Sequence, residues 1–132
     1  MMDDTISVLR KCGIQPTPQR IAVVDCVLEC GTHPSADEIL TLSRKKCPTV
    51  SRATVYNTLK LLVEKGLLKA QVLREGTILF DANTDKHHHI IDEQTGEIYD
   101  IPWDKLKVNG TENLDDFEVI DYHVVIRGKK RK

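Results

Sequence analysis

Four stretches in the first half of the chain place apolar residues at helical spacing. The first, residues 6–13, is short and stops at Gly13, since glycine commonly ends a helix. The second has Thr17 as its N-cap and Pro18 in the first helical position, and it ends near Gly31. Its predicted buried face consists of Ile21, Val24 and Leu28.

The third and fourth stretches lie on either side of Pro48, which is expected to end the third helix. Ser35 and Glu38 have the spacing of a capping box, so a helix should begin there, with Ile39, Leu40 and Leu42 on its apolar side. The fourth helix starts at residue 51 and closes at residue 66. Its buried stripe consists of Val55, Leu59, Leu62 and Val63. Two short helices joined by a three-residue turn indicate a helix-turn-helix motif.

Beyond residue 66 the pattern changes to that of strands. Residues 67–74 and 77–80 are strand-like runs joined at Arg74, Glu75 and Gly76, which completes a winged helix-turn-helix. A strand from residue 87 should return antiparallel over residues 96–100 after a turn at residues 93–96. Residues 117–126 should add a strand that pairs with both. The expected fold class is therefore α+β: a winged helix-turn-helix at residues 1–80, a hinge at 81–86, and a small α/β domain with a basic tail at 87–132.

The polar side of the fourth helix carries groups that can read double-stranded DNA. Arginine and asparagine bond base edges, whereas tyrosine and threonine contact phosphate or a thymine methyl group. The alternative is an ordinary amphipathic helix with a solvated face, and the hairpin that follows weighs against it. The predicted DNA-binding residues are Lys11, Arg20, Arg52, Thr54, Tyr56, Asn57 and Lys60.

Charge is nearly balanced over the 132 residues, with 19 basic and 20 acidic side chains, but it is unevenly distributed. Residues 1–80 carry a net charge of +3, residues 81–126 carry −9, and the tail at 127–132 carries +5. This asymmetry indicates two modules with different partners. No apolar run approaches the roughly 20 residues that span a bilayer, and no export signal is recognisable, so we expect a cytoplasmic protein without a membrane partner.

The four cysteines are Cys12, Cys26, Cys30 and Cys47, and none forms a Cys-x-x-Cys pair. In a cytosolic chain such residues are expected to be free thiols. Cys26 and Cys30 lie four residues apart on a predicted helix, where they are either small buried side chains, which we favour, or a thiol switch.

The segment from residue 81 to 100 is rich in potential metal ligands. Strand alternation sends His87 and His89 to one face and His88 to the other. The returning strand brings Asp100 beside the first two, which predicts the beginning of a metal site. The alternative is a solvated run of histidines. His33, taken alone, is expected to be a surface residue on the loop before the third helix.

Four motifs resemble the ferric uptake regulator family of bacterial metal-responsive repressors, and the similarity covers nearly the whole chain. The motifs are Pro16–Arg20, His33–Ala36, Ser51–Tyr56 and Asp85–His89. Within the family, the chain most resembles the peroxide-sensing branch. That branch typically has aspartate at positions 81 and 100, where iron-uptake members usually have Glu, and often has asparagine at position 57, where they tend to have Arg.

The resemblance implies a homodimeric repressor of operator DNA and not an enzyme. Its regulatory ligands would be His33, Asp81, His87, His89 and Asp100. Three nitrogens and two oxygens without sulfur suit Fe(II) or Mn(II), one ion per subunit, which would join the two modules. In the peroxide-sensing branch, bound Fe(II) reacts with hydrogen peroxide, His33 or His87 takes up oxygen, and the repressor leaves DNA.

Two departures from the family limit the expected metal content. The first Cys-x-x-Cys pair of many members corresponds to Asp92 and Thr95, and the sequence from Gly128 to Lys132 contains no second pair, so no structural zinc is expected. Tyr122 stands where many members have a ligand histidine, and the adjacent His123 should point the other way, so no auxiliary metal site is expected.

Three alternatives remain open. One is an iron-, manganese- or zinc-responsive repressor of the same family that does not sense peroxide. Another is a metalloenzyme, although no additional general base or glycine-rich loop accompanies the ligands. The third is a metal-independent DNA-binding protein with a thiol switch at Cys26 and Cys30.

Overall fold

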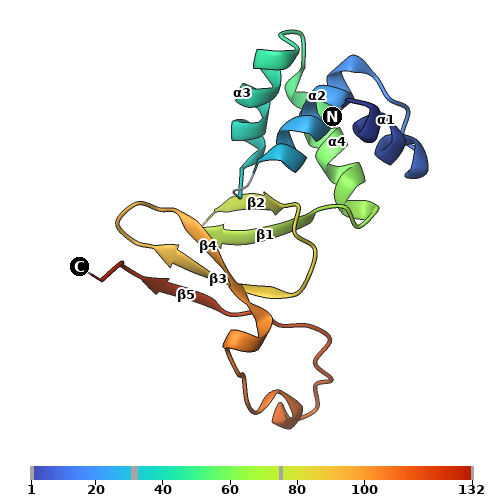
Figure 1. Cartoon of the computed structure of the whole chain (residues 1–132). Helices are drawn as coiled ribbons and strands as arrows, with labels where there is room; N and C mark the ends of the chain where they lie inside the picture. The colour runs from blue at the N-terminus through green and yellow to red at the C-terminus, as the bar shows by residue number, and fades with distance from the viewer. Residues whose placement is uncertain (1, 31–32, 75, 132) are drawn as a thin grey trace. The chain divides into compact units, whose positions relative to one another are not determined.

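A computed structural model describes residues 2–30, 33–74 and 76–131 of the chain. The chain forms two compact units, one ending at Thr84 and the other beginning at Asp85, and each is described by itself. Figure 1 shows that the four helices belong to the first unit, whereas the second is built around three strands. Within the described ranges, none of the helices combines the length and apolar character of a membrane span.

Three of the four helices begin at a hydroxyl side chain. The helices are α1 (Met2–Lys11), α2 (Pro18–Glu29), α3 (Ala36–Lys46) and α4 (Arg52–Glu64). Thr17, Ser35 and Ser51 cap the last three by accepting the backbone N–H three residues further on. Ser35 and Glu38 form the complete capping box, so both predicted starts at Thr17 and Ser35 are confirmed.

The buried face of α2 differs from the prediction. Val24 is fully buried, but Leu28 is 41% exposed, and Val23 and Val27 are buried instead. Helix α2 packs against α1, α3 and α4, so its buried surface is wider than the single predicted stripe and includes Val23 and Val27. Leu28 lies on the side of α2 that these helices leave uncovered. The prediction for α3 was wrong in the same way at Leu42, which is 36% exposed.

The predicted helix boundaries also need correction. Helix α1 begins at Met2, four residues earlier than expected. Five residues, not three, separate α3 from α4, and α3 already ends at Lys46, before Pro48. Val50 in this connection is 1% exposed, and its carbonyl oxygen accepts a hydrogen bond from Nε of Arg44 at 3.0 Å. The connection is therefore packed into the helical core.

A two-stranded hairpin, β1 (Lys69–Arg74) and β2 (Thr77–Asp81), completes the first unit. Residue 67 was predicted to start β1, but the N–H of Leu67 bonds the carbonyl of Leu62 in α4 at 2.9 Å. The strand therefore starts two residues later. The predicted end of α2 at Gly31, the junction residue Thr32 and the turn residue Glu75 lie outside the described residues.

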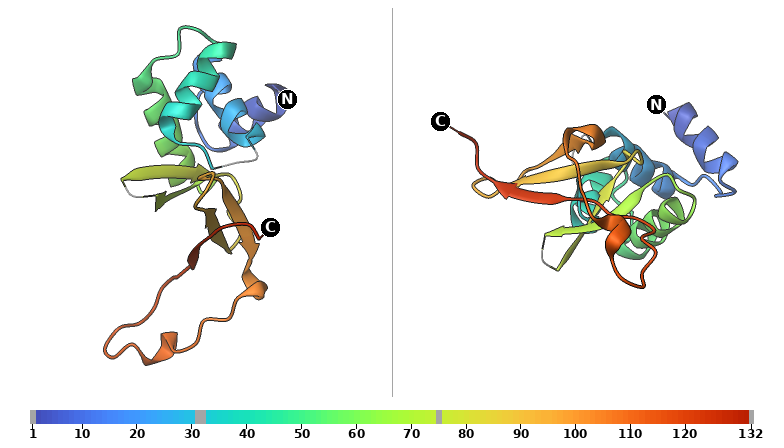
Figure 2. Two further views of the ribbon diagram at one scale, coloured as in Figure 1. Left: turned by 90° about the vertical axis from the view of Figure 1, so that its left-hand side faces the viewer. Right: turned by 90° about the horizontal axis from the view of Figure 1, so that it is seen from below.

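The second unit is a three-stranded sheet in the order β4-β3-β5. Strands β3 (His87–Asp92) and β4 (Ile98–Pro102) form the predicted antiparallel hairpin, and β5 (Val125–Gly128) lies parallel to β3, as two further views show (Figure 2). Between β4 and β5 are two short 3₁₀ turns, η1 (Trp103–Lys105) and η2 (Thr111–Asn113). An α+β chain with a winged helix-turn-helix and a small second domain is confirmed.

The strand predicted at residues 117–126 was largely wrong. Only residues 125 and 126 belong to β5, and they pair with β3 alone. Strand β4 already occupies one edge of β3, so β5 can reach only the other edge. Phe117 and Ile120 are 81% and 95% exposed, so the preceding segment lacks an apolar surface in its own unit against which a strand would pack.

Candidate functional site

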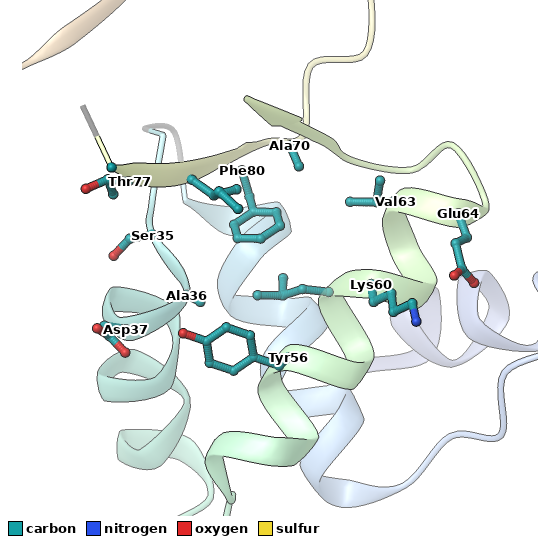
Figure 3. A pocket seen from close by; sticks show the side chains of 13 residues that line it. Ser35, Ala36, Asp37, Tyr56, Lys60, Val63, Glu64, Ala70, Thr77 and Phe80 are labelled. Carbon is teal, nitrogen blue, oxygen red and sulfur yellow. The ribbon is translucent and has the colours of Figure 1, made fainter. Parts of the chain in front are cut away.

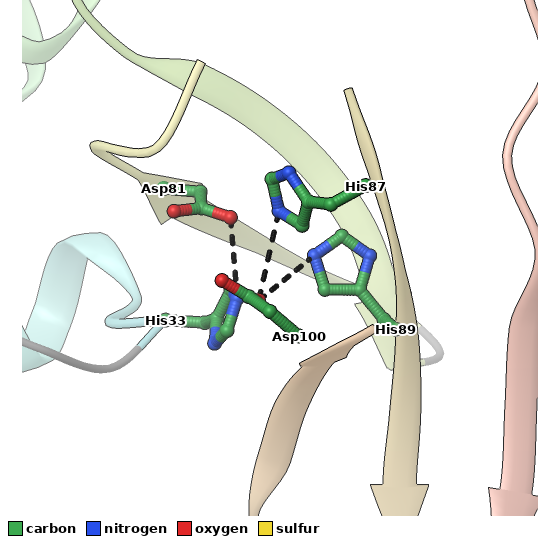
Figure 4. Close-up of side chains that lie close together, drawn as sticks. All are labelled: His33, Asp81, His87, His89 and Asp100. Atoms are coloured by element: carbon green, nitrogen blue, oxygen red, sulfur yellow. Dashed lines mark ion pairs between the residues drawn. The ribbon is translucent and has the colours of Figure 1, made fainter. Parts of the chain in front are cut away.

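Among the described residues, two groups of side chains carry atoms that could bind a metal ion, one group in each unit, and Figure 4 draws both. In the first unit, residues 34–35 pair with residues 79–80 through an isolated antiparallel bridge and a 2.9 Å hydrogen bond. This pairing holds His33 beside Asp81, the last residue of β2. Nε2 of His33 lies 3.2 Å from Oδ2 of Asp81, and the two side chains are 7% and 8% exposed.

The two oxygens of Asp81 have different neighbours. Oδ1 accepts a hydrogen bond from the backbone N–H of Asn83 at 2.9 Å, in the turn that follows β2. Oδ2 is the oxygen that faces His33. The turn thus fixes the carboxylate plane. The expectation that His33, taken alone, is a surface residue was wrong, since its side chain is only 7% exposed.

In the second unit, strand register brings His87, His89 and Asp100 together. His89 is the direct cross-strand partner of Asp100, and Oδ1 of Asp100 lies 3.6 Å from Nε2 of both histidines. The two imidazole rings pack edge to face, with centroids 4.6 Å apart. Both histidine side chains are buried, whereas that of Asp100 is 38% exposed. The predicted alternation along the strand is confirmed.

Backbone bonding selects the tautomer of His87. Its Nδ1 lies 2.5 Å from the carbonyl oxygen of Asp85, and a carbonyl can only accept, so Nδ1 carries the proton. Nε2 is then the lone-pair nitrogen, and it is the atom that faces Asp100. A histidine whose other nitrogen donates to a carbonyl has the usual arrangement of a metal ligand.

His88 points to the opposite face of β3 and has a structural environment. It stacks on Trp103 at 4.3 Å, and its Nδ1 accepts the N–H of Val124 at 2.9 Å. Tyr122 packs against the same indole at 5.0 Å. His123 instead lies against His89 at 5.7 Å, and burial followed by the neighbouring imidazole lowers the pKa of His123.

The spacing within each group fits a metal ion. Two atoms bound to one ion at about 2.1 Å, with angles between about 90° and 120°, lie about 3.0 to 3.6 Å apart. The nitrogen-to-oxygen distances of 3.2 Å in the first unit and 3.6 Å in the second fall within this range. Each group therefore has the geometry of part of a coordination shell.

The candidate DNA-binding residues on α4 lie on one exposed face. The opposite face of the helix buries Val55, Leu59 and Leu62. Four predicted residues are exposed: Arg52, Tyr56, Asn57 and Lys60. Beside them, a cavity of about 550 Å³ is lined by side chains of this helix, of the start of α3 and of the hairpin (Figure 3). A long polar helix face beside a hairpin is suited to the major groove.

The other three candidates have different surroundings. The hydroxyl of Thr54 accepts a hydrogen bond from Ser51 at 2.9 Å and is part of the helix cap. Nη1 of Arg20 donates to the carbonyl oxygen of Gln15 at 2.9 Å. Lys11 is exposed at the end of α1.

One polar residue near this helix was missed by sequence reasoning. Oδ1 of Asp37, in the first turn of α3, lies 2.5 Å from Nη1 of Arg52. Asp37 contributes most to raising the pKa of Arg52, through a side-chain hydrogen bond and charge attraction. Nothing in the local sequence pattern identifies the pair, because its members lie 15 positions apart.

The positions of the first Cys-x-x-Cys pair have ordinary turn contacts. Oδ1 of Asp92 accepts the N–H of Gln94 at 2.9 Å, and the sequence has no cysteine after residue 47. The end of β5 is attached to this turn by a hydrogen bond from the N–H of Glu93 to the carbonyl of Gly128 at 2.8 Å. Cys12, Cys26 and Cys47 are free thiols. Cys26 is buried as predicted, whereas Cys30 is only half-buried.

These features define a winged-helix DNA-binding protein whose second unit carries clustered side chains that could bind a metal ion. Residues 11–127 match the ferric uptake regulator family, and the chain belongs to that family of metal-responsive transcriptional repressors.

Relatives include the peroxide-responsive repressor PerR of Staphylococcus aureus (strain Mu50 / ATCC 700699). It is 35% identical over 129 residues, which cover 96% of this chain and 87% of that protein. Among solved structures, the ferric uptake regulator of Pseudomonas aeruginosa with manganese has a TM-score of 0.71 at 25% identity over 100% of both chains. The Campylobacter jejuni peroxide stress regulator has a TM-score of 0.66 at 24% identity, covering 100% of this chain and 97% of that one, and shows the fold alone.

Proposed function

We propose that this protein is a metal-dependent repressor that senses hydrogen peroxide through oxidation of a ligand histidine. The observation that carries the proposal is the ligand set itself. His33, Asp81, His87, His89 and Asp100 offer three imidazole nitrogens and two carboxylate oxygens, without sulfur. Such a set suits Fe(II) or Mn(II), with one position of an octahedron left for a small ligand.

One ion per subunit is proposed to use both groups of ligands. Neither group alone offers more than three donors, whereas together they offer five. Because His33 and Asp81 belong to the DNA-binding unit and the other three residues to the second unit, the ion would restrict the relative motion of the units. Metal binding and operator binding are then thermodynamically linked, and each strengthens the other.

When bound, Fe(II) would supply the redox chemistry that activates peroxide. In the net reaction one oxygen atom of hydrogen peroxide would enter a ring carbon of His33 or His87, the other would leave as water, and the imidazole would lose two electrons. The altered imidazole would be a poorer ligand, so His33 or His87 would no longer hold the ion and operator affinity would fall. Similarity to a peroxide-responsive repressor at 35% identity, together with aspartate at positions 81 and 100, supports this branch of the family.

The functional unit is proposed to be a homodimer in the cytoplasm that presents two α4 helices to a palindromic operator. Exposed apolar side chains between β4 and β5 support association of two copies. They are Leu114, Phe117, Val119 and Ile120. No structural zinc is proposed, since the residues from 85 onward contain no cysteine.

The experiment that tests this function is peptide mass spectrometry after anaerobic loading with Fe(II) or Mn(II) and a brief peroxide pulse. We expect one added oxygen on the peptides containing His33 or His87 with iron, none with manganese, and loss of operator binding only in the oxidised sample. Cys26→Ser/Cys30→Ser should respond like the unmodified chain.

Unoxidised histidines at verified Fe(II) occupancy would leave a metal-responsive repressor without peroxide sensing. Loss of the response in the double serine variant would favour the thiol switch. Continuous consumption of excess peroxide would favour a metalloenzyme.

A further inference from the structure

The first turns of α3 and α4 are linked through a side-chain pair. Asp37 is the second residue of α3 and Arg52 the first residue of α4. Nη1 of Arg52 lies 2.5 Å from Oδ1 of Asp37. The capping box of Ser35 and Glu38 fixes the turn that carries Asp37, so the carboxylate is presented from a rigid element.

Arg52 has a second partner on its own helix. Tyr56 lies one turn further along α4, and its phenol makes a minor contribution to the raised pKa of Arg52, after that of Asp37. Figure 3 shows the Tyr56 ring extending from α4 toward the helix that carries Asp37. Arg52 therefore has the Asp37 carboxylate as its direct partner and the Tyr56 side chain as a neighbour on its own helix, and both are substantially exposed.

Two roles are conceivable for this contact: Asp37 either withholds Arg52 from DNA or orients it. The side chains of Arg52 and Asp37 are 61% and 73% exposed, and an ion pair in that setting contributes little free energy. In water such a pair does not withhold an arginine from phosphate or bases, but its attraction strengthens where docked DNA excludes water, so it still orients the guanidinium in the complex. A guanidinium has five N–H donors in a rigid plane, so bonding through Nη1 leaves other donors for a base edge.

We propose that Asp37 is a positioning residue that sets the base preference of Arg52 when α4 lies in the major groove. This inference rests on the proposed operator-binding function. Holding the guanidinium plane in one orientation favours bidentate bonding to guanine and disfavours the other bases. The carboxylate itself repels phosphate, so its contribution is to specificity and not to overall affinity.

The test is a binding selection from duplexes with a randomised core, using the full-length protein loaded with Mn(II). The unmodified protein should enrich a palindrome. In the Asp37→Asn variant, the preference for guanine should fall by about tenfold at one symmetry-related pair of positions in the palindrome. The base preferences at the other positions should stay the same. The variant's affinity for unselected duplexes should stay the same or rise.

Two further variants separate positioning from charge and folding. Glu64→Gln removes the same charge from an exposed residue of α4 that does not contact Arg52, so it should keep the full preference. In an Arg52→Ala background, Asp37→Asn should change nothing further at that pair of positions.

The proposal is overturned if Asp37→Asn keeps the wild-type preference at every position, or if Asp37→Asn lowers it equally with and without Arg52. Failure of the unmodified Mn(II)-loaded protein to enrich any sequence contradicts the proposed function as well, which distinguishes the two failures.

Discussion

Three consecutive histidines have two different roles in β3, because side chains alternate along a strand. His87 and His89 face Asp100, whereas His88 is enclosed by Trp103 and accepts a backbone hydrogen bond from Val124. A run that looks uniform in the sequence is thus divided between the proposed metal site and the attachment of the segment that leads into β5.

At this scale, Asp100→Asn should lower Mn(II) affinity by at least about tenfold, because it replaces a negatively charged oxygen ligand by a neutral amide. Isothermal titration calorimetry measures the change. Asp104→Asn, at an exposed position in η1, is the control and should bind like the unmodified chain. Equal affinities for the two variants would remove Asp100 from the site.

Trp103 should report metal binding through its fluorescence. It is the only tryptophan in the chain and stacks on His88. In the sequence, His88 lies between the proposed ligands His87 and His89. Mn(II) is paramagnetic, so emission should fall as the site fills and recover with a chelator. Calorimetric binding without any emission change would contradict the assignment of the ion to the second unit.

At the scale of elements, short polar caps decide where helices begin and also orient the site. Ser35 caps α3 and pairs with Leu79 of β2, so a single residue fixes both the helix start and the neighbourhood of His33. In the segment before β5, by contrast, the local sequence pattern does not determine the secondary structure. Its apolar residues resemble those of a strand, yet of residues 117–126 only the last two join the sheet of the described second unit.

Ser35→Ala should destabilise the protein by about 1 kcal/mol, because the first turn of α3 loses its cap. Urea unfolding measures this as a lower midpoint at an unchanged slope. Thr41→Ala is the matched control, since its hydroxyl only bonds the carbonyl of Asp37 within the same helix. An equal loss in both variants would show that the cap is unimportant.

At the scale of the whole molecule, the exposed apolar segment between β4 and β5 is expected to form the dimer interface. Ile120 is 95% exposed in a single chain, so Ile120→Glu should leave the protomer folded and weaken the dimer. Sedimentation equilibrium should show a monomer for this variant. Val72→Glu on the hairpin, where Val72 is 64% exposed, should remain dimeric. A dimeric Ile120→Glu protein would place the interface elsewhere.

Interactions between residues close in the sequence made many helix starts and strand faces predictable. Hydroxyl caps at Thr17 and Ser35 start helices through bonds that span three residues, and alternation along β3 requires only backbone geometry. The pairing of His87 and His89 on one face, and of Asp100 beside them, follows from a hairpin whose turn is itself local. The motifs that indicated the family are likewise contiguous segments.

Tertiary structure decided what depends on distant partners. Leu28 is exposed because three neighbouring helices leave that side of α2 uncovered, although its spacing resembles that of a buried residue. His33 lies beside Asp81 because a bridge between Ser35 and Leu79 joins segments more than 40 positions apart. The Asp37–Arg52 pair likewise needs two helix starts to meet. Hydrogen bonding within one turn is determined by sequence, whereas burial and ion pairing depend on which surfaces the whole fold brings together.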